Sequence, residues 1–374
     1  MLQVLCQDLF PGMVVARPIV DNLNRVLLSP GQVLTEYYIR RIKEMDIPVI
    51  FVEDGMGVEE DQGPVSWETA HKAARTLRQS YENCLRTGQL QIGDISGQVD
   101  QIIEELLANR SAMIGMAGLK SHDEYTYQHS VHVCILAVMV GISLGYSRPR
   151  VRELGMGAIL HDIGKMFIPR EILNKAEGLS EIDWEIVREH AWKGFNLMRR
   201  SNRVTLISAH VALQHHERLD GSGYPRSLCG EAIHEYAQIT AVADIFDALV
   251  SDRPYRSAYS NKQALDILNS YRDVKIKSKF IDHLQDCINP YPAGTIVELS
   301  NGDIAIVASN NNNQADRPVV KPIFSALGHA YKNQVLDLEQ HPDIDIAGIL
   351  DPEQSRRVAA QYLRLKIRPS HPYQ

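Results

Sequence analysis

The amino-acid sequence predicts a mainly α-helical protein that carries a small β-containing unit at each end. Between residues 67 and 290, apolar residues recur at every third or fourth position, as in "AARTLRQSYENCL" and "VDQIIEELLANRSAMIGMAGL", which is the period of amphipathic helices. Near both ends, short apolar runs are separated by Gly, Pro and Asn, a pattern typical of strands and turns. A chain of 374 residues allows two or three domains.

The N-terminal unit is expected over residues 1–55 and combines strands with one helix. The stretches "VVARPIV" and "RVLLSPGQVL" have the composition of strands and a turn. Thr35 is a suitable cap for a short helix over "EYYIRRIKEM", in which Ile39 and Ile42 share one face, and "IPVIFVE" predicts a returning strand. Residues 56–66 fall in the acidic, Gly-rich stretch "DGMGVEEDQGPVS", so we expect them to form a linker.

The remaining chain is expected to form a helical domain over residues 67–290 and a small β-containing segment over residues 291–374. "TIVELSNGDIAIVAS" predicts a β-hairpin that turns at Asn301 and Gly302, and "RPVVKPIF" predicts a further strand. The tail contains a possible helix at "PEQSRRVAAQYLRL". No internal repeat is evident in the sequence.

Composition and charge argue against several classes of protein. The formal net charge of −7 disfavours a protein that binds nucleic-acid polymers, which needs clustered Lys and Arg. The longest apolar run, "VCILAVMVGISLGY", is too short to span a bilayer and suits a buried core helix, so we expect no membrane partner. The N-terminus lacks the pattern of a signal peptide, and the five cysteines form no CxxC pair, which favours a reduced, cytoplasmic location.

The helical region contains histidines and aspartates in a pattern that favours a metal site. Asp244 lies among small or apolar residues in "AVADIF", and a carboxylate in such a helix is costly to bury unless it is paired or coordinates a metal. The His161–Asp162 pair follows the apolar stretch "GMGAIL", and His215 and His216 are adjacent. Imidazole together with carboxylate is a ligand set for Fe, Mn, Zn or Ni rather than for Ca or Mg alone. The candidate ligands, in chain order, are His129, His161, Asp162, His190, His215, His216 and Asp244.

Each of these residues is weak evidence alone, because a lone buried histidine is more often a core residue than a ligand. Their order within one helical segment is much harder to explain by chance. Four other histidines lack a matching pattern and are expected at the surface or in packing positions: His122, His132, His210 and His234.

Three motifs together resemble a known family. "HDIGK", "HHERLDGSGYP" and "ADIFDALVSDRPYR" are similar to the motifs of the HD-GYP domain, a branch of the HD phosphohydrolase superfamily. The resemblance covers about residues 100–290 and implies an all-helical HD-type bundle core. It also implies the activity of these bacterial enzymes, which hydrolyse the 3'-5' phosphodiester of the second messenger cyclic di-GMP.

The resemblance assigns roles to individual residues. It implies that all seven candidate ligands bind metal, with Asp162 as a bridge between two ions, and that Lys165 is catalytic. On the substrate side it implies contacts from the turn that gives the family its name and from two arginines, and we place Asp247 there as well. These expected substrate contacts are Gly221, Gly223, Tyr224, Pro225, Asp247, Arg253 and Arg256.

The expected mechanism uses two divalent transition-metal ions, with iron or manganese favoured over zinc, nickel or cobalt. Two close metals bind the phosphate oxygens and lower the pKa of a bridging water, so that a hydroxide attacks the phosphorus. Lys165 follows Asp162 by three residues, which places it on the same side of a helical turn, where its charge stabilises the phosphorane oxygens. The product is linear pGpG, GMP or both.

Two alternatives remain open at this stage. The chain could be an HD hydrolase of another cyclic dinucleotide or of a nucleotide, although "GYP" and "RPYR" favour cyclic di-GMP. It could also be a catalytically weak module that docks signalling proteins, although degenerate members usually lose ligands and this chain retains all seven. A homodimer and signalling-protein partners are compatible with both.

Overall fold

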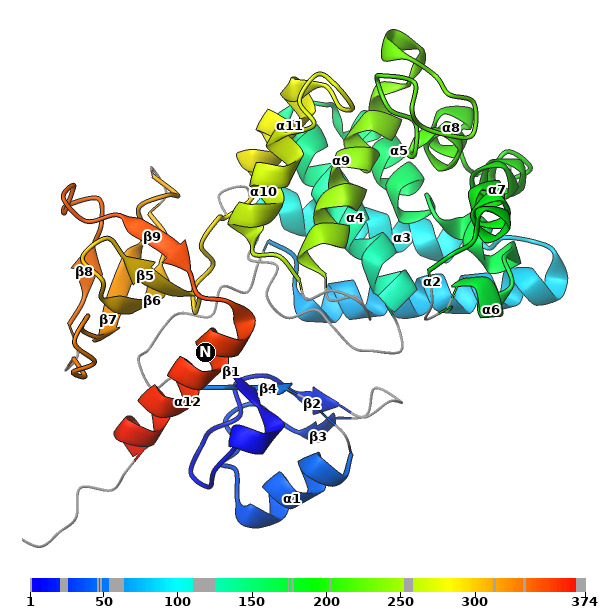
Figure 1. Ribbon diagram of the computed structural model, residues 1–374. Coiled ribbons are helices and arrows are strands. Elements are labelled where there is room, and N and C mark those ends of the chain that lie inside the picture. Colours follow the sequence, from blue (N-terminus) through cyan, green and yellow to red (C-terminus); the bar gives the residue numbers. More distant parts are fainter. Residues whose placement is uncertain are drawn as a thin grey trace, which may run out of the picture. The chain divides into compact units, whose positions relative to one another are not determined.

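The protein is described by a computed structural model in which the chain divides into two compact units (Figure 1). One unit spans Gln62–Pro290, and the other combines Met1–Asp61 with Tyr291–Gln374. The structure describes residues 2–20, 26–45, 47, 49–53, 64–109, 125–173, 175, 178–201, 203–251, 258–311, 314–331 and 334–367.

The first unit is helical, which confirms the mainly α-helical prediction. Its helices are α2 (Trp67–Thr87), α3 (Ile92–Ala108), α4 (Tyr125–Ser143), α5 (Arg148–Ile159), α6 (Arg170–Leu173), α7 (Glu181–Met198), α8 (Leu206–Gln214), α9 (Glu235–Val250), α10 (Asn261–Asn269) and α11 (Ser278–Gln285), with short 3-10 helices η2 (Ile163–Phe167) and η3 (Gly230–Ala232).

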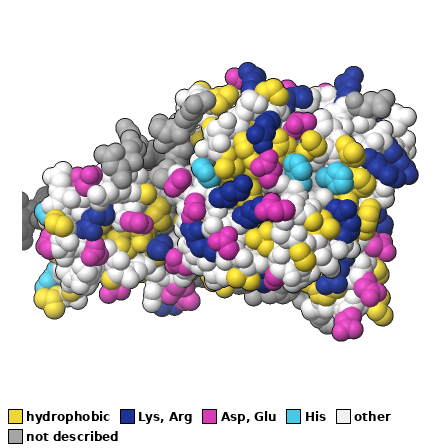
Figure 2. Space-filling model, turned by 90° about the horizontal axis from the view of Figure 1, so that it is seen from above, with side chains coloured by type: hydrophobic (Ala, Val, Ile, Leu, Met, Phe, Trp, Pro, Cys, Tyr) yellow, Lys and Arg dark blue, Asp and Glu magenta, His cyan; other side chains and the backbone are white. Residues whose placement is uncertain are grey.

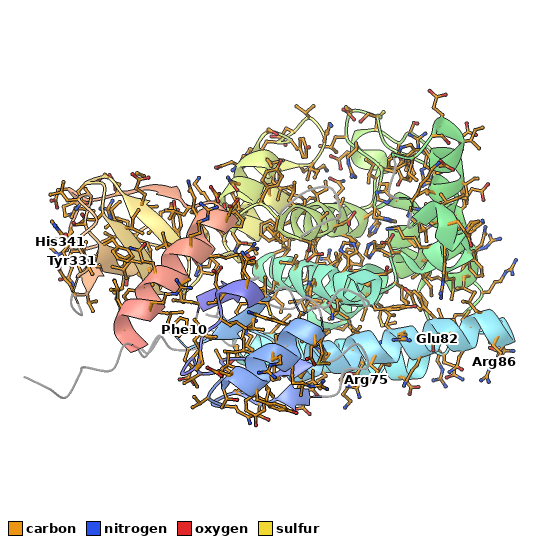
Figure 3. The ribbon with its side chains drawn as sticks, turned by 60° about the horizontal axis from the view of Figure 1, so that its bottom comes forward. Phe10, Arg75, Glu82, Arg86, Tyr331 and His341 are labelled. Atoms are coloured by element: carbon orange, nitrogen blue, oxygen red, sulfur yellow. The ribbon has the colours of Figure 1, made fainter. Side chains whose placement is uncertain are left out.

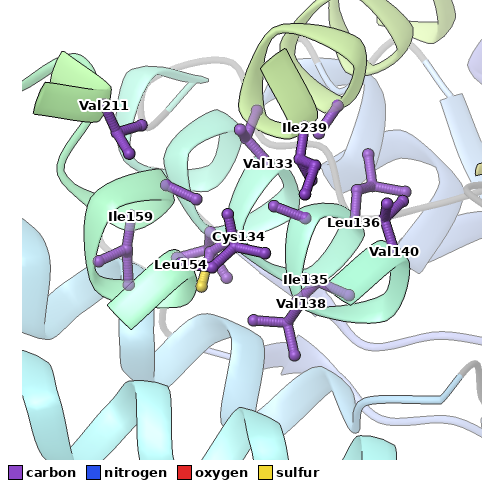
Figure 4. Packing of buried hydrophobic residues seen from close by; sticks show 14 of the residues in the cluster. Val133, Cys134, Ile135, Leu136, Val138, Val140, Leu154, Ile159, Val211 and Ile239 are labelled. Atoms are coloured by element: carbon purple, nitrogen blue, oxygen red, sulfur yellow. The ribbon is translucent and has the colours of Figure 1, made fainter. Parts of the chain in front are cut away.

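Helix α4 forms the centre of this unit. Its side chains between residues 131 and 140 are buried on every side, against α2, α5 and α9 (Figure 4). A helix that is apolar all round suits such a central position. Within the described residues, Thr126–Ser143 is the one segment long and apolar enough to cross a membrane, and 78% of it is buried inside the protein, as in core helices of globular proteins.

Helix α2 shows how the outer helices are specified. Leu77 and Tyr81 lie on its buried face, whereas Arg75, Glu82 and Arg86 lie along its exposed side (Figure 3). This division follows the 3.6-residue period of the sequence, and it orients the helix against α3 and α4. On the face seen in Figure 2, acidic and basic side chains are interspersed, with histidines among them.

The second unit contains all the strands of the described residues. They are β1 (Leu2–Leu5), β2 (Ile19–Val20), β3 (Val26–Leu28), β4 (Val49–Val52), β5 (Ile296–Leu299), β6 (Ile304–Ser309), β7 (Val319–Phe324), β8 (Leu336–Asp337) and β9 (Ile346–Ile349), together with η1 (Cys6–Asp8), α1 (Glu36–Glu44) and α12 (Pro352–Ile367). Strands β1 and β4 pair, β2 and β3 pair, and the C-terminal strands form an antiparallel sheet in the order β8-β7-β6-β5-β9.

Several predicted elements of this unit are confirmed. Thr35 caps α1 by accepting a hydrogen bond from the Tyr38 backbone N–H, and the β5–β6 hairpin turns at Gly302, which has a φ of +83°. The sequence suggested separate units at the two ends, but Leu2 and Val4 share one hydrophobic core with Leu363 of α12 and with side chains of β5, β6 and β7. This long-range contact has no signature in local periodicity.

Candidate metal centre

The His161–Asp162 pair lies where α5 ends and η2 begins, and both side chains are at most 1% exposed. Helix η2 packs directly on the backbone of α7, since a Cβ atom at Gly164 would lie 1.9 Å from the carbonyl oxygen of His190. The glycine of "HDIGK" therefore permits the close contact that brings this turn next to His190.

The structure brings the seven predicted ligands together in two groups. Within each group, the nitrogen and oxygen atoms able to bind a metal all lie within 4.8 Å of one another. We call them the three-histidine cluster, formed by Asp162, His190, His215 and His216, and the two-histidine cluster, formed by His129, His161 and Asp244.

The Asp162 carboxylate faces both clusters. Its Oδ1 atom lies 3.5 Å from His190 Nε2 and 3.7 Å from His215 Nε2. Its Oδ2 atom lies 3.2 Å from His161 Nε2 and 3.8 Å from His129 Nε2. One carboxylate oxygen on each side is the arrangement that a bridging ligand needs.

Backbone carbonyls orient three of the imidazoles. The ring Nδ1 atom lies within hydrogen-bond distance of the carbonyl oxygen three residues earlier in His161 (2.7 Å), His190 (2.5 Å) and His215 (3.0 Å). A carbonyl can only accept, so Nδ1 carries the proton and Nε2 keeps its lone pair. The Nε2 atoms face the clusters. The tautomer with its proton on Nδ1 is therefore the one that leaves Nε2 able to bind a metal.

Burial keeps the imidazoles of the three-histidine cluster uncharged. It lowers the pKa of His190 to about 3, and it also lowers the pKa values of His215 and His216. An uncharged imidazole is the form that ligates a metal, so these rings need not lose a proton on binding at neutral pH.

Two buried atoms in the centre show that the residues fit a metal. His161 Nε2 and Asp162 Oδ1 have no hydrogen-bond partner among the described residues. A buried polar atom without a partner is costly, and a bound cation would satisfy both atoms. The imidazole and carboxylate donors suit a transition metal, as the sequence predicted.

His129 is held differently, between two carboxylates of α9. Its Nε2 atom lies 3.1 Å from Asp244 Oδ1, and its Nδ1 atom lies 2.6 Å from Asp247 Oδ2. Burial by itself lowers the pKa of His129, but the hydrogen bonds to Asp244 and Asp247 outweigh this and raise it well above the usual value.

Asp247 does not occupy the substrate side that the sequence suggested. The residue is completely buried, and its second oxygen lies 3.1 Å from Nδ1 of His132. With both oxygens engaged by histidines, Asp247 orients His129 instead of meeting a ligand. His132 is buried, as expected for a packing residue, but its ring also contacts the Asp247 carboxylate. Its position three residues after His129 on a helix is the sequence feature that indicates this shared partner.

Lys165 lies beside the bridging carboxylate. Its Nζ atom donates to Asp162 Oδ2 at 2.6 Å, and its side chain is 30% exposed. Burial raises the pKa of Asp162, but the charge of Lys165 together with the neighbouring imidazoles of His161 and His215 outweighs this and holds it well below the usual value. Asp162 is therefore an ionised carboxylate with a cation on its partly open side.

The "HHERLDGSGYP" segment forms a loop that closes back on itself. The Glu217 carboxylate, 3% exposed, accepts hydrogen bonds from the backbone N–H groups of Arg226 (2.8 Å) and Leu228 (2.9 Å). A Cβ atom at Gly223 would lie 2.4 Å from the His216 carbonyl oxygen. The glycine is thus required by the loop's own backbone, and the role of Glu217 has no signal in the sequence.

Of the remaining predicted substrate contacts, Tyr224 lies against a residue of the three-histidine cluster. Tyr224 stacks on His216, with ring centroids 4.6 Å apart and an angle of 28° between the planes. Gly221 adopts a left-handed φ of +78° and Pro225 is half-buried. Arg253 and Arg256 lie outside the described residues, so their roles stay predictions.

Comparison with known proteins identifies two family models in the chain. The HD domain model matches residues 102–279, which contain all seven candidate ligands. The model of a KOW domain associated with the HD domain matches residues 296–357, which contain the C-terminal sheet.

Similar curated proteins carry the names of cyclic-dinucleotide phosphodiesterases. The chain is 36% identical over 258 residues to a cyclic di-GMP phosphodiesterase of Pseudomonas aeruginosa, which covers 68% of this chain and 61% of that protein. It is 34% identical over 166 residues to 3'3'-cGAMP-specific phosphodiesterase 1 of Vibrio cholerae, covering 44% of this chain and 38% of that protein. The matches thus span less than two thirds of these relatives.

One solved structure supports the fold. Bd1817, an HDG"Y"P protein from Bdellovibrio bacteriovorus, superposes with a TM-score of 0.51 at 16% identity, over 76% of this chain and 98% of that one. At this identity the likeness concerns the fold alone.

Proposed function

Since the chain belongs to the HD-domain family, in its HD-GYP branch, we propose that it is a metal-dependent phosphodiesterase that hydrolyses the 3'-5' phosphodiester of cyclic di-GMP. The observation that carries the proposal is the Asp162 carboxylate, which presents one oxygen to each of two ligand clusters. A structural site for one ion needs no such shared carboxylate.

The proposed metal ligands are the seven residues of the two clusters, with iron or manganese as the favoured metals. Two bound divalent ions would supply Lewis-acid chemistry at the phosphate and a nucleophile at neutral pH. The protein's own contribution is to keep His190, His215 and His216 uncharged by burial and to fix the direction of their Nε2 atoms.

Lys165 is the proposed catalytic cation. Its partly exposed ammonium lies at the edge of the bridging carboxylate, where it can meet the phosphate oxygens as negative charge develops on them. Tyr224 closes another edge of the site with its ring on His216. Arg253 and Arg256 remain proposed contacts to the substrate.

3'3'-cGAMP is the second candidate substrate, because one relative is named for it. That dinucleotide has the same phosphodiester ring and differs from cyclic di-GMP in one base. The metal centre treats both alike, so the choice between them depends on residues that contact the bases.

The decisive experiment is turnover by the full chain purified without oxygen and loaded with iron or manganese. We expect hydrolysis of cyclic di-GMP to pGpG, GMP or both, resolved by chromatography, with 3'3'-cGAMP as the competing substrate. His215→Ala should remove the activity, and His283→Ala, which changes a histidine outside both clusters, should keep it. Loading with metal but no turnover of either dinucleotide would refute the proposal and favour a docking module.

A further inference from the structure

Arg188 is an exposed cation next to the metal centre that no motif singles out. It belongs to α7, two residues before His190, and its Cζ atom lies 5.3 Å from the centre of the Tyr224 ring. Among the described residues it makes neither an ion pair nor a hydrogen bond, whereas its neighbour Glu189 pairs with Lys193 at 2.9 Å. A cation–π contact fixes the guanidinium and leaves its N–H donors available.

The Tyr224 ring links Arg188 to the clusters. The same ring stacks on His216 and lies 6.3 Å from the ring of His190. Arg188, Tyr224 and His216 thus form a column that leads from exposed surface to a proposed metal ligand. A group bound at Arg188 would be only one aromatic ring away from a group bound at the three-histidine cluster.

Two other described cations near this part of the centre already have partners. Lys165 donates to Asp162, and the Arg218 guanidinium donates to the backbone carbonyl oxygens of His215 and Glu217, each at 2.9 Å. Arg188 therefore differs from them in having a charge that is both exposed and uncommitted within the described residues.

We propose that Arg188 binds the second phosphate of the cyclic dinucleotide, the one that is not being cleaved, and so favours substrates with two phosphodiesters over substrates with one. This inference rests on the proposed function. The two phosphates belong to one small ring, so when one is at the clusters the other must be nearby. A guanidinium binds a phosphate through two parallel hydrogen bonds, and stacking on Tyr224 orients its plane in advance.

The competing role for an arginine here is recognition of a guanine edge, which also uses two hydrogen bonds. Lysine separates the two roles. It can hold a phosphate as a point charge, but it lacks the planar fork that reads a guanine edge in this way. Arg188→Lys should therefore keep most of a phosphate contact and lose most of a guanine contact.

The test is steady-state kinetics of the metal-loaded full chain with cyclic di-GMP and with bis(p-nitrophenyl) phosphate, which has a single phosphodiester. Arg188→Ala should raise the KM for cyclic di-GMP about tenfold, as expected for loss of roughly one charged hydrogen-bonding contact. The KM for bis(p-nitrophenyl) phosphate should change much less, and Arg188→Lys should restore most of the loss.

Arg199→Ala is the matched control, because Arg199 follows the same helix and lies 5.6 Å from the Phe195 ring in a similar cation–π contact. It should behave as wild type, and all variants should retain wild-type metal content by elemental analysis. Equal effects of Arg188→Ala on both substrates, no effect on either, or no rescue by lysine would each overturn the assignment. If the wild type cleaves bis(p-nitrophenyl) phosphate but no cyclic dinucleotide, the proposed function itself fails.

Discussion

The histidines of the two ligand clusters are oriented by two different means, backbone carbonyls and a carboxylate. In the three-histidine cluster, His190 and His215 use backbone carbonyls of their own helices. In the two-histidine cluster, His161 also uses a backbone carbonyl, but His129 on α4 depends on a carboxylate of α9, Asp247. The first arrangement forms with the helix itself, and the second exists only when two helices have packed.

The two clusters also differ in the protonation of their imidazoles. Burial lowers the pKa values of the imidazoles in the three-histidine cluster, while two carboxylates raise that of His129. Single substitutions can hardly remove a backbone carbonyl, but they can remove Asp247. We therefore expect the two-histidine cluster to be the one that side-chain substitutions beyond the ligands can weaken selectively.

The largest effect is expected where the two clusters meet. Asp162→Ala removes a ligand from both, so metal content should fall at both sites and turnover of cyclic di-GMP should be lost. Elemental analysis and a turnover assay measure the two effects together. Asp266→Ala, which removes an exposed carboxylate paired with Lys262, is the control. Full metal content with a near-normal rate in Asp162→Ala would show that the carboxylate is not shared.

A smaller effect is expected for the cation beside this bridge. Lys165→Ala should lower kcat by about 10²–10³-fold, the usual loss for one preorganised group that stabilises transition-state charge. Metal content should stay close to that of the wild type, because an ammonium is not a ligand. An unchanged kcat with a raised KM would instead assign Lys165 to uniform substrate binding.

Asp247→Asn tests the comparison directly. The amide keeps one oxygen but replaces the other with a donor that faces an Nδ1–H group, so the support of His129 or His132 is lost. Loss of such a supporting hydrogen bond typically weakens metal binding by about 10–100-fold. Titration against a chromophoric chelator should therefore show one weakened ion and one unchanged ion. Equal weakening of both ions would mean that the clusters respond as a unit.

The sequence indicated which residues come together in the two clusters far better than it indicated the groups that support them. His161, Asp162 and Asp244 were recognisable because polar residues inside apolar helices need a reason to be there. The role of Asp247 was not predictable in this way, because a second aspartate one helical turn from Asp244 suits either a buried partner or a substrate contact. Only the packing of α4 on α9 decides between these.

The same limit applied to the fold. Helices and hairpins follow local periodicity and turn residues, so the helical region and the β5–β6 hairpin were predicted well. The core that Leu2 and Val4 share with Leu363 joins residues more than 350 positions apart. Arg188 was not predictable either, since an exposed arginine on a helix has no distinctive sequence pattern and only the fold places it over the Tyr224 ring.

The smallest predicted effect concerns the stability of α7. It tests whether that stability influences the orientation of His190, the metal-ligand candidate on this helix. Ser180 caps this helix in a capping box with Asp183, so Ser180→Ala should lower the free energy of unfolding by about 1 kcal/mol in a denaturant titration.

Hydrogen bonds from Lys175 and Ser180 lower the pKa of Asp183 to about 2. A lowered pKa in the folded state means that the Asp183 contribution is complete above about pH 4 and is lost as the pH falls toward 2. The wild type and the variant should therefore approach each other in stability at acid pH. Metal affinity at neutral pH should be unchanged, because the carbonyl that orients His190 lies well inside the helix. A weaker affinity in this variant would show that the backbone does not fix this imidazole independently of the helix end.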